Sequence, residues 1–162
     1  MIQIEVTLNS KKIKLKGHPM ERLLDSIRNT GAIGTKEGCG EGECGACSIL
    51  LDGKLVNSCL IPLAQVEACE IITVEGLAEG KKLNSLQQSF LQCGGAQCGI
   101  CTPGMLIAST YLLNKFPIPS REEIKEGLAG NFCRCTGHTK IIESIENLNK
   151  KGCHYEGVCS KL

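Results

Sequence analysis

Alternation of apolar and polar residues dominates the first half of the chain. Over residues 2–15 nearly every second position is apolar, apart from a polar turn in the middle, and this period of two predicts a β-hairpin. Residues 48–56 repeat the pattern around Asp52 and Gly53, a dipeptide typical of tight hairpin turns. Residues 71–74 add a further apolar run. The sequence therefore predicts a mostly β first half.

Apolar residues that lie three and four positions apart predict helices elsewhere. One short helix is expected before a glycine-rich loop from Gly34 to Gly45, and four are expected in the second half. Thr102 has the place of an N-cap before Pro103, and residues 120–123 have the sequence of a capping box. The apolar stripes consist of Met20, Leu23, Leu24 and Ile27 in the first half and of Leu83, Leu86, Phe90, Ile124, Leu128, Ile141, Ile142, Ile145 and Leu148 in the second.

The change from strand to helix pattern divides the chain near residue 80. A length of 162 residues is enough for two small domains. We predict an α+β chain with a strand-rich domain over residues 1–77, a helical domain over residues 78–150 and a C-terminal tail over residues 151–162 that has no periodicity. Only 3% of residues are aromatic, so aliphatic side chains must form the core.

Charge and targeting signals narrow the classes of function. The net charge is +1 and no block of like charges occurs, which argues against partners such as nucleic acid or a membrane surface. The N-terminus lacks the basic start and apolar run of a secretory signal, and no apolar run approaches the ~18 residues of a membrane span. We therefore expect a cytoplasmic protein. In that compartment thiols stay reduced, so the 12 cysteines favour metal binding over disulfides.

Four cysteines of the first half have a spacing with chemical meaning. Cys39, Cys44 and Cys47 follow the pattern C-x4-C-x2-C, and Cys59 follows after eleven more residues. This spacing is typical of plant-type proteins that bind a 2Fe–2S cluster. The surrounding glycines free the backbone to wrap around a cluster and to direct N–H groups at its sulfurs. Zinc is the alternative, although structural zinc sites usually have paired Cys-x2–4-Cys knuckles.

A second group of four cysteines lies in the helical half. Cys98 and Cys101 are separated by two residues, and Cys133 and Cys135 by one. Each pair precedes an expected helix, whose N-terminal dipole and free amides favour thiolates. The four thiolates could hold a metal centre at one end of the helices. Spacing alone leaves open whether that centre is a 2Fe–2S cluster or zinc.

The remaining cysteines give no clear sign of a site. We interpret Cys69 and Cys93 as small buried apolar residues, and we assign Cys153 and Cys159 to the tail. No nucleophile–base pair, phosphate loop or pair of carboxylates is apparent. Redox is therefore the chemistry that the sequence indicates.

Three motifs give the chain a family resemblance: residues 37–47 (EGCGEGECGAC), 97–104 (QCGICTPG) and 130–137 (GNFCRCTG). Over residues 1–150 the chain resembles the small iron–sulfur subunit of the xanthine dehydrogenase/aldehyde oxidoreductase family of molybdenum hydroxylases. The resemblance implies an N-terminal β-grasp, ferredoxin-like domain and a C-terminal four-helix bundle. His138 departs from the family pattern, which commonly has an aromatic Tyr there.

The resemblance also implies a second 2Fe–2S cluster on Cys98, Cys101, Cys133 and Cys135. In the family that cluster lies nearer the molybdenum cofactor and the first lies nearer the flavin. Gln97 matches a residue beside the pterin, and Cys135 matches the ligand closest to it. The implied partners are a large molybdenum-binding subunit and a medium FAD-binding subunit. Single electrons would pass from the molybdenum cofactor through both clusters to FAD.

Two other functions remain as alternatives: a free-standing ferredoxin-like carrier and a zinc-stabilised interaction module without redox activity. A lone carrier needs only one cluster, so the helical half argues against it. The substrate of an assembled enzyme stays open among a purine, an aldehyde and an N-heterocycle, because specificity would belong to a partner chain.

Overall fold

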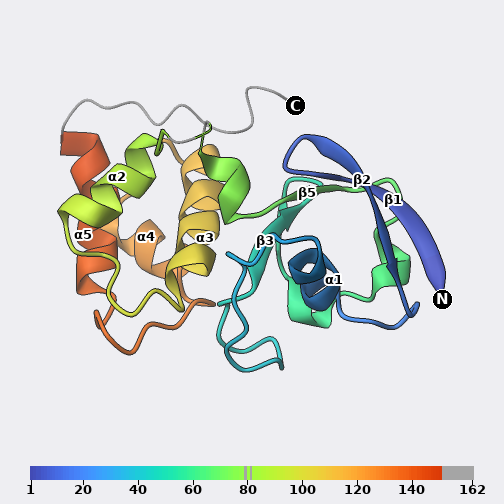
Figure 1. The fold of residues 1–162 in the computed structure, drawn as a ribbon. Helices are drawn as coiled ribbons and strands as arrows, with labels where there is room; N and C mark the ends of the chain where they lie inside the picture. The colour runs from blue at the N-terminus through green and yellow to red at the C-terminus, as the bar shows by residue number, and fades with distance from the viewer. Residues whose placement is uncertain (79, 81, 151–162) are drawn as a thin grey trace.

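The computed structural model describes residues 1–78, 80 and 82–150, and a five-stranded mixed sheet forms its first half (Figure 1). The strand order is β2-β1-β5-β3-β4, in which β1 pairs with β5 in parallel and the other neighbours are antiparallel. Both predicted hairpins are confirmed. The strands are β1 (Ile2–Leu8), β2 (Lys11–Gly17), β3 (Ser48–Leu51), β4 (Lys54–Asn57) and β5 (Glu70–Ile72).

Helix α1 (Leu23–Asn29) covers one face of this sheet. Its residues Leu23 and Ile27 are fully buried against strand residues such as Val6 and Ile49. Met20 was predicted to share this stripe, but it precedes the helix and is 69% exposed. Short 3-10 helices lie between β4 and β5, at η1 (Ser58–Leu60) and η2 (Leu63–Gln65), and after β5, at η3 (Val74–Leu77).

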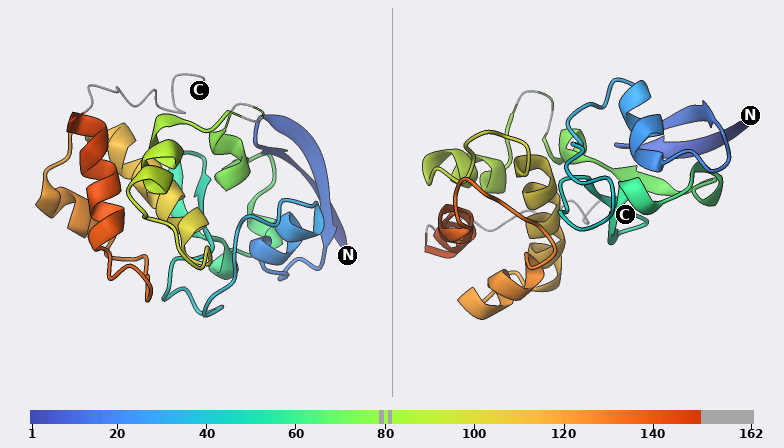
Figure 2. Two further views of the ribbon diagram at one scale, coloured as in Figure 1. Left: turned by 60° about the vertical axis from the view of Figure 1, so that its left-hand side comes forward. Right: turned by 90° about the horizontal axis from the view of Figure 1, so that it is seen from below.

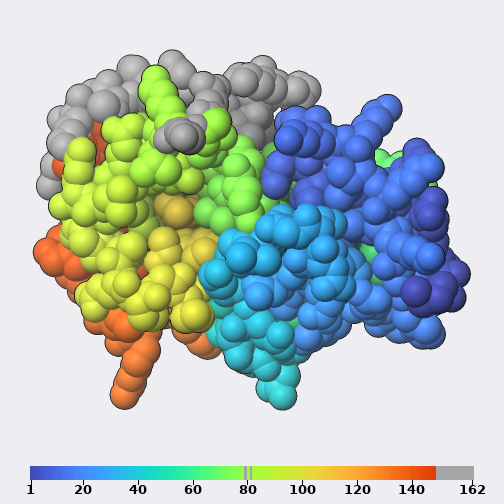
Figure 3. Space-filling view, in the orientation of Figure 1, coloured from blue at the N-terminus to red at the C-terminus, as the bar shows by residue number. Residues whose placement is uncertain are grey.

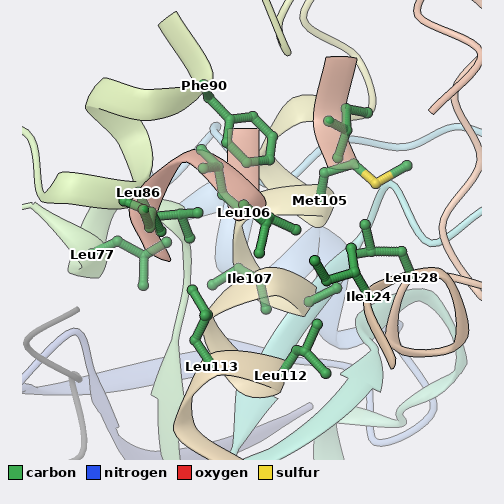
Figure 4. Packing of buried hydrophobic residues seen from close by; sticks show 14 of the residues in the cluster. Leu77, Leu86, Phe90, Met105, Leu106, Ile107, Leu112, Leu113, Ile124 and Leu128 are labelled. Atoms are coloured by element: carbon green, nitrogen blue, oxygen red, sulfur yellow. The ribbon is translucent and has the colours of Figure 1, made fainter. Parts of the chain in front are cut away.

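The second half contains four helices, which confirms their predicted number among the described residues: α2 (Ser85–Gln92), α3 (Thr102–Lys115), α4 (Arg121–Gly127) and α5 (Thr139–Lys150). Figure 4 shows Phe90 of α2, Met105 of α3 and Ile124 of α4 in one apolar core, and all three are at most 1% exposed. The α+β class is thus confirmed. A regular four-helix bundle stays a prediction.

Capping boxes fix where two of these helices, α2 and α4, begin. The predicted capping box of Ser120 and Glu123 is present at α4. A second one, of Asn84 with Gln87, begins α2 and was not predicted. The N-cap of α3 is Cys101 and not Thr102, which is the first helical residue.

The two halves share a core across helix α3, which lies against β3 (Figures 1 and 2). Leu50 and Ile72 of the sheet are buried in the same apolar cluster as the helical residues. The predicted domain boundary after residue 77 stays a prediction. Figure 3 shows the glycine-rich loop, in cyan, next to the yellow segment that leads into α3. Among the described residues, no helix has both the length and the apolarity needed to cross a membrane.

Candidate iron–sulfur sites

The cysteines of the first quartet lie on two segments that the fold brings together. Cys39, Cys44 and Cys47 lie in the loop between α1 and β3, and Cys59 lies in η1, directly after β4. Cys39 is exposed, Cys44 is half-buried, and Cys47 and Cys59 are buried beside Leu24. The Ser58 hydroxyl and amide both donate to the Cys47 carbonyl, at 2.8 and 3.2 Å, and so tie the two segments together.

The thiols of this quartet meet in two pairs. Backbone amides of Glu41 and Cys44 each donate to the Cys39 sulfur at 3.4 Å, and the Cys39 amide donates to the Cys44 sulfur at 3.3 Å. The amide donors lower the pKa of Cys39 to about 7, because they stabilise its thiolate. Burial raises the pKa of Cys47 to about 11, and Cys47 contacts Cys59. The predicted N–H groups directed at sulfur are therefore present.

Arg22 anchors the start of this loop. Its guanidinium donates to Asp25 at 2.7 Å and to Glu37 at 2.7 Å, and Glu37 begins the first cysteine motif. These hydrogen bonds, first to Asp25 and then to Glu37, raise the pKa of Arg22. Sequence reasoning missed this residue, because the partners are set by where α1 packs.

The second quartet converges from two loops at the N-terminal ends of α3 and α5. Cys101 contacts Cys133, and both are half-buried against the helical core. Cys98 contacts Cys135, and both are exposed. The structure thus brings all four predicted residues together, again as two pairs.

Hydrogen bonds and burial act in opposite directions on these thiols. Burial raises the pKa of Cys101 to about 12. Burial also acts to raise the pKa of Cys133, but the Thr136 hydroxyl, at 3.0 Å, and the Thr136 amide, at 3.4 Å, donate to its sulfur, so its pKa is lowered overall. Thr102, beside Cys101, keeps a buried hydroxyl with no protein partner. Thiols with donors close by fit a cluster whose sulfurs accept hydrogen bonds.

The two quartets are joined by a buried contact that the sequence did not reveal. The Phe132 amide donates to the Cys44 carbonyl at 2.9 Å, and Phe132 directly precedes Cys133. A Cβ on Gly104, in the first turn of α3, would lie 2.1 Å from the Gly45 carbonyl oxygen. Gly45 itself has a φ of +67°, which favours glycine. The backbone of α3 therefore touches the backbone of the first-site loop at Gly104, with no room there for a side chain.

Comparisons with known proteins agree with this geometry. Residues 6–73 match the family model of the 2Fe-2S iron-sulfur cluster binding domain, and residues 73–146 match that of the 2Fe-2S binding domain. The small FeS subunit of nicotinate dehydrogenase from Eubacterium barkeri is 46% identical over 89% of this chain and 92% of its own length. The iron-sulfur-binding subunit of xanthine dehydrogenase from Escherichia coli O157:H7 is 42% identical over 92% of this chain and 95% of its own. The chain belongs to the iron–sulfur subunits of the molybdenum hydroxylase family.

A solved structure extends the likeness to the fold. A chain of quinoline 2-oxidoreductase from Pseudomonas putida 86 superposes with a TM-score of 0.88 and 43% sequence identity, covering 93% of this chain and 97% of that one. As a molybdenum hydroxylase iron–sulfur subunit, the chain carries two 2Fe–2S binding domains and serves electron transfer in an oxidoreductase. Which cysteines bind iron stays a prediction.

The other cysteines and histidines of this subunit lie outside both quartets. Cys69 and Cys93 are half-buried, so the expectation of small buried residues is only partly correct. His18 is exposed, and His138 has a φ of +66°. Cys153, His154 and Cys159 fall outside the described residues.

Replacing both Cys69 and Cys93 with serine should leave about four irons per chain, the content of two 2Fe–2S clusters. Neither thiol contacts a quartet: the Cys69 thiol donates to the Glu67 carbonyl at 3.7 Å, and Cys93 lies 3.9 Å from the Ser89 hydroxyl. Iron analysis of the purified double variant, beside wild-type protein, checks this. A loss of iron would mean that the quartets have been chosen wrongly.

Proposed function

We propose that this chain passes single electrons from a molybdenum cofactor on a large partner subunit to FAD on a medium partner subunit. The observation that carries the proposal is the pair of cysteine quartets, one in each half, joined by a buried contact between their loops. When bound, a 2Fe–2S cluster in each quartet would supply one-electron redox chemistry. The chain would hold these centres at a fixed separation and tune them by burial and hydrogen bonds.

The two sets of proposed iron ligands are Cys39, Cys44, Cys47 and Cys59 for the first cluster and Cys98, Cys101, Cys133 and Cys135 for the second. In both sets the thiols meet in pairs. Two pairs suit two irons that each take two protein thiolates, whereas one zinc ion takes all four at about 2.3 Å. Within the described part of the chain, no group of three His, Cys, Asp or Glu side chains could hold a single metal ion. The pairing therefore favours clusters over a zinc-stabilised module.

Each site has one exposed side through which a partner can exchange electrons. Cys39 is exposed at the first site, and Cys98 and Cys135 are exposed at the second. Gln97 is exposed directly before Cys98. We propose that Gln97 and Cys135 face the pterin of the molybdenum cofactor, and that Cys39 lies on the side of the flavin. A free-standing carrier has no need of two exposed sites at separate loops.

The names of the relatives, and no residue of this chain, support a proposal for the substrate class. The relatives reported above are named for nicotinate, xanthine and quinoline, which are all nitrogen heterocycles. We propose that the assembled enzyme hydroxylates such a ring at the large subunit. No residue of this chain is assigned to that step.

The test compares the assembled complex with this chain alone. The complex, isolated anaerobically through a tag on this chain, should contain molybdenum, FAD and both partner subunits. Adding nicotinate or xanthine should bleach its iron–sulfur absorbance, and an electron acceptor should restore it. The purified chain should be red-brown and should not react with either substrate. Turnover by the chain alone would contradict the subunit role, and zinc in place of iron would contradict the redox function.

A further inference from the structure

Asn131 lies buried between the two cluster-binding loops. Its side chain is on the second-site loop, two residues before Cys133, and the residue is only 3% exposed. The side-chain amide donates to the Gly45 carbonyl at 2.8 Å and to the Ser48 hydroxyl at 3.2 Å. Gly45 lies between the first-site cysteines Cys44 and Cys47 along the chain. One side chain therefore connects the two sites directly.

The contact continues through the first site as a polar network. The Ser48 hydroxyl donates to the Gly45 carbonyl at 2.8 Å and lies 3.3 Å from the Asn57 side-chain oxygen. The Asn57 side-chain amide donates to the Gly42 carbonyl at 2.7 Å. Gly42 lies in the loop between Cys39 and Cys44, and Asn57 lies two residues before Cys59. The network thus holds backbone on several sides of the first quartet.

Both loops depend on this network because they contain little regular structure. Without the Asn131 amide, the Gly45 carbonyl would keep only the hydrogen bonds from Ser48 of its own loop, so no side chain would join the two loops at this point. The backbone hydrogen bond from Phe132 to Cys44 joins the same loops, but it fixes only one point. The side chain of Asn131 adds two further points at Gly45 and Ser48 and so restricts rotation of one loop against the other.

We propose that Asn131 is a positioning residue that sets the separation and orientation of the two clusters. The inference rests on the proposed function, since it requires a cluster at each quartet. The hydrogen bonds of the Asn131 side chain do not reach a cysteine sulfur of either quartet. Asn131 acts instead through Gly45, Ser48 and the backbone next to the ligands. Because magnetic coupling and electron exchange between two centres fall steeply with distance, both should depend on this side chain.

The test is Asn131→Ala, read by electron paramagnetic resonance. With one cluster reduced at a time, each signal should keep its wild-type shape and the iron content should stay at about four per chain. With both clusters reduced, the splitting caused by their mutual coupling should shrink or become unresolved. Asn131→Asp keeps the shape of the side chain but removes its amide donor, so it should reduce the splitting in the same way.

Ser89→Ala is the matched control. The Ser89 hydroxyl is buried and donates to the Ser144 carbonyl at 2.6 Å, which joins α2 to α5 within the helical half. Its removal should lower the melting temperature without changing the splitting. If Asn131→Ala does not fold, Ser48→Ala tests the positioning role in its place. Ser48→Ala removes the hydroxyl at the centre of the network, so it should also reduce the splitting.

Unchanged splitting in a variant that retains both clusters would overturn the positioning role. Failure of the proposed function looks different, because wild-type protein would then lack one or both cluster signals.

Discussion

Cys44→Ser is expected to remove about two irons per chain and to leave the second cluster intact, because a serine hydroxyl is a much weaker iron ligand than a cysteine thiolate. Cys101→Ser is expected to remove the second cluster and to leave the first intact. The structure supports this independence, because the thiol contacts of Cys44 stay within the first quartet and those of Cys101 within the second. Iron analysis and electron paramagnetic resonance of each variant measure the effect.

The variant without Cys69 and Cys93 is the control, because it removes thiols outside both quartets. Loss of both resonance signals from either single variant, in protein that still has its wild-type circular dichroism, would show that the two sites are not independent.

Gly104→Ala should be strongly destabilising. Alanine normally stabilises a helix relative to glycine by about 1 kcal/mol. Here its Cβ would lie 2.1 Å from the Gly45 carbonyl oxygen and 3.2 Å from the Ala46 Cα, both of which are backbone. The helix must therefore move away from the loop, at an expected cost of about 3 kcal/mol in the free energy of unfolding. Thermal melting should show a fall of roughly 6–12 °C.

Gly130→Ala is the matched control at the same junction. A Cβ at Gly130 would meet no atom within 4 Å, and its backbone does not have a positive φ. Its free energy of unfolding should change by no more than about 0.5 kcal/mol. Equal melting temperatures for Gly104→Ala and Gly130→Ala would show that α3 and the loop are less tightly joined than the structure indicates. Iron content should follow stability, because Gly104 is three residues from Cys101 and Gly45 is next to Cys44.

Local pattern was enough to predict most elements of the fold. The hairpin of β1 and β2, the start of α4 at its capping box and the buried stripe of α5 each depend on residues close in sequence. Met20 shows the limit of this reasoning. Its spacing to Leu23 is helical, but the chain enters α1 only after Arg22, whose backbone bridges to Pro62, and no core lies over Met20.

The candidate sites, like the fold, could be predicted from the sequence only in part. Cysteine spacing and the resemblance predicted eight ligands, and the structure brings each quartet together. Spacing could not show that the thiols meet in pairs, because Cys98 and Cys135 are 37 positions apart and only the packing of α2, α3 and α5 places them in contact.

The sequence by itself predicted most of the strands and helices and the eight candidate cysteines, because these follow from periodicity, capping or a short motif. Only the tertiary structure decided that Asn131 reaches Gly45, that Gly104 packs on the same carbonyl and that Leu50 of the sheet lies in the helical core. Asn131 and Gly104 lie 86 and 59 positions from Gly45 along the chain. An asparagine in a loop or a glycine in a helix has no distinctive neighbours in sequence. The roles of Asn131 and Gly104 therefore follow only from how α3 and the two cysteine loops pack together.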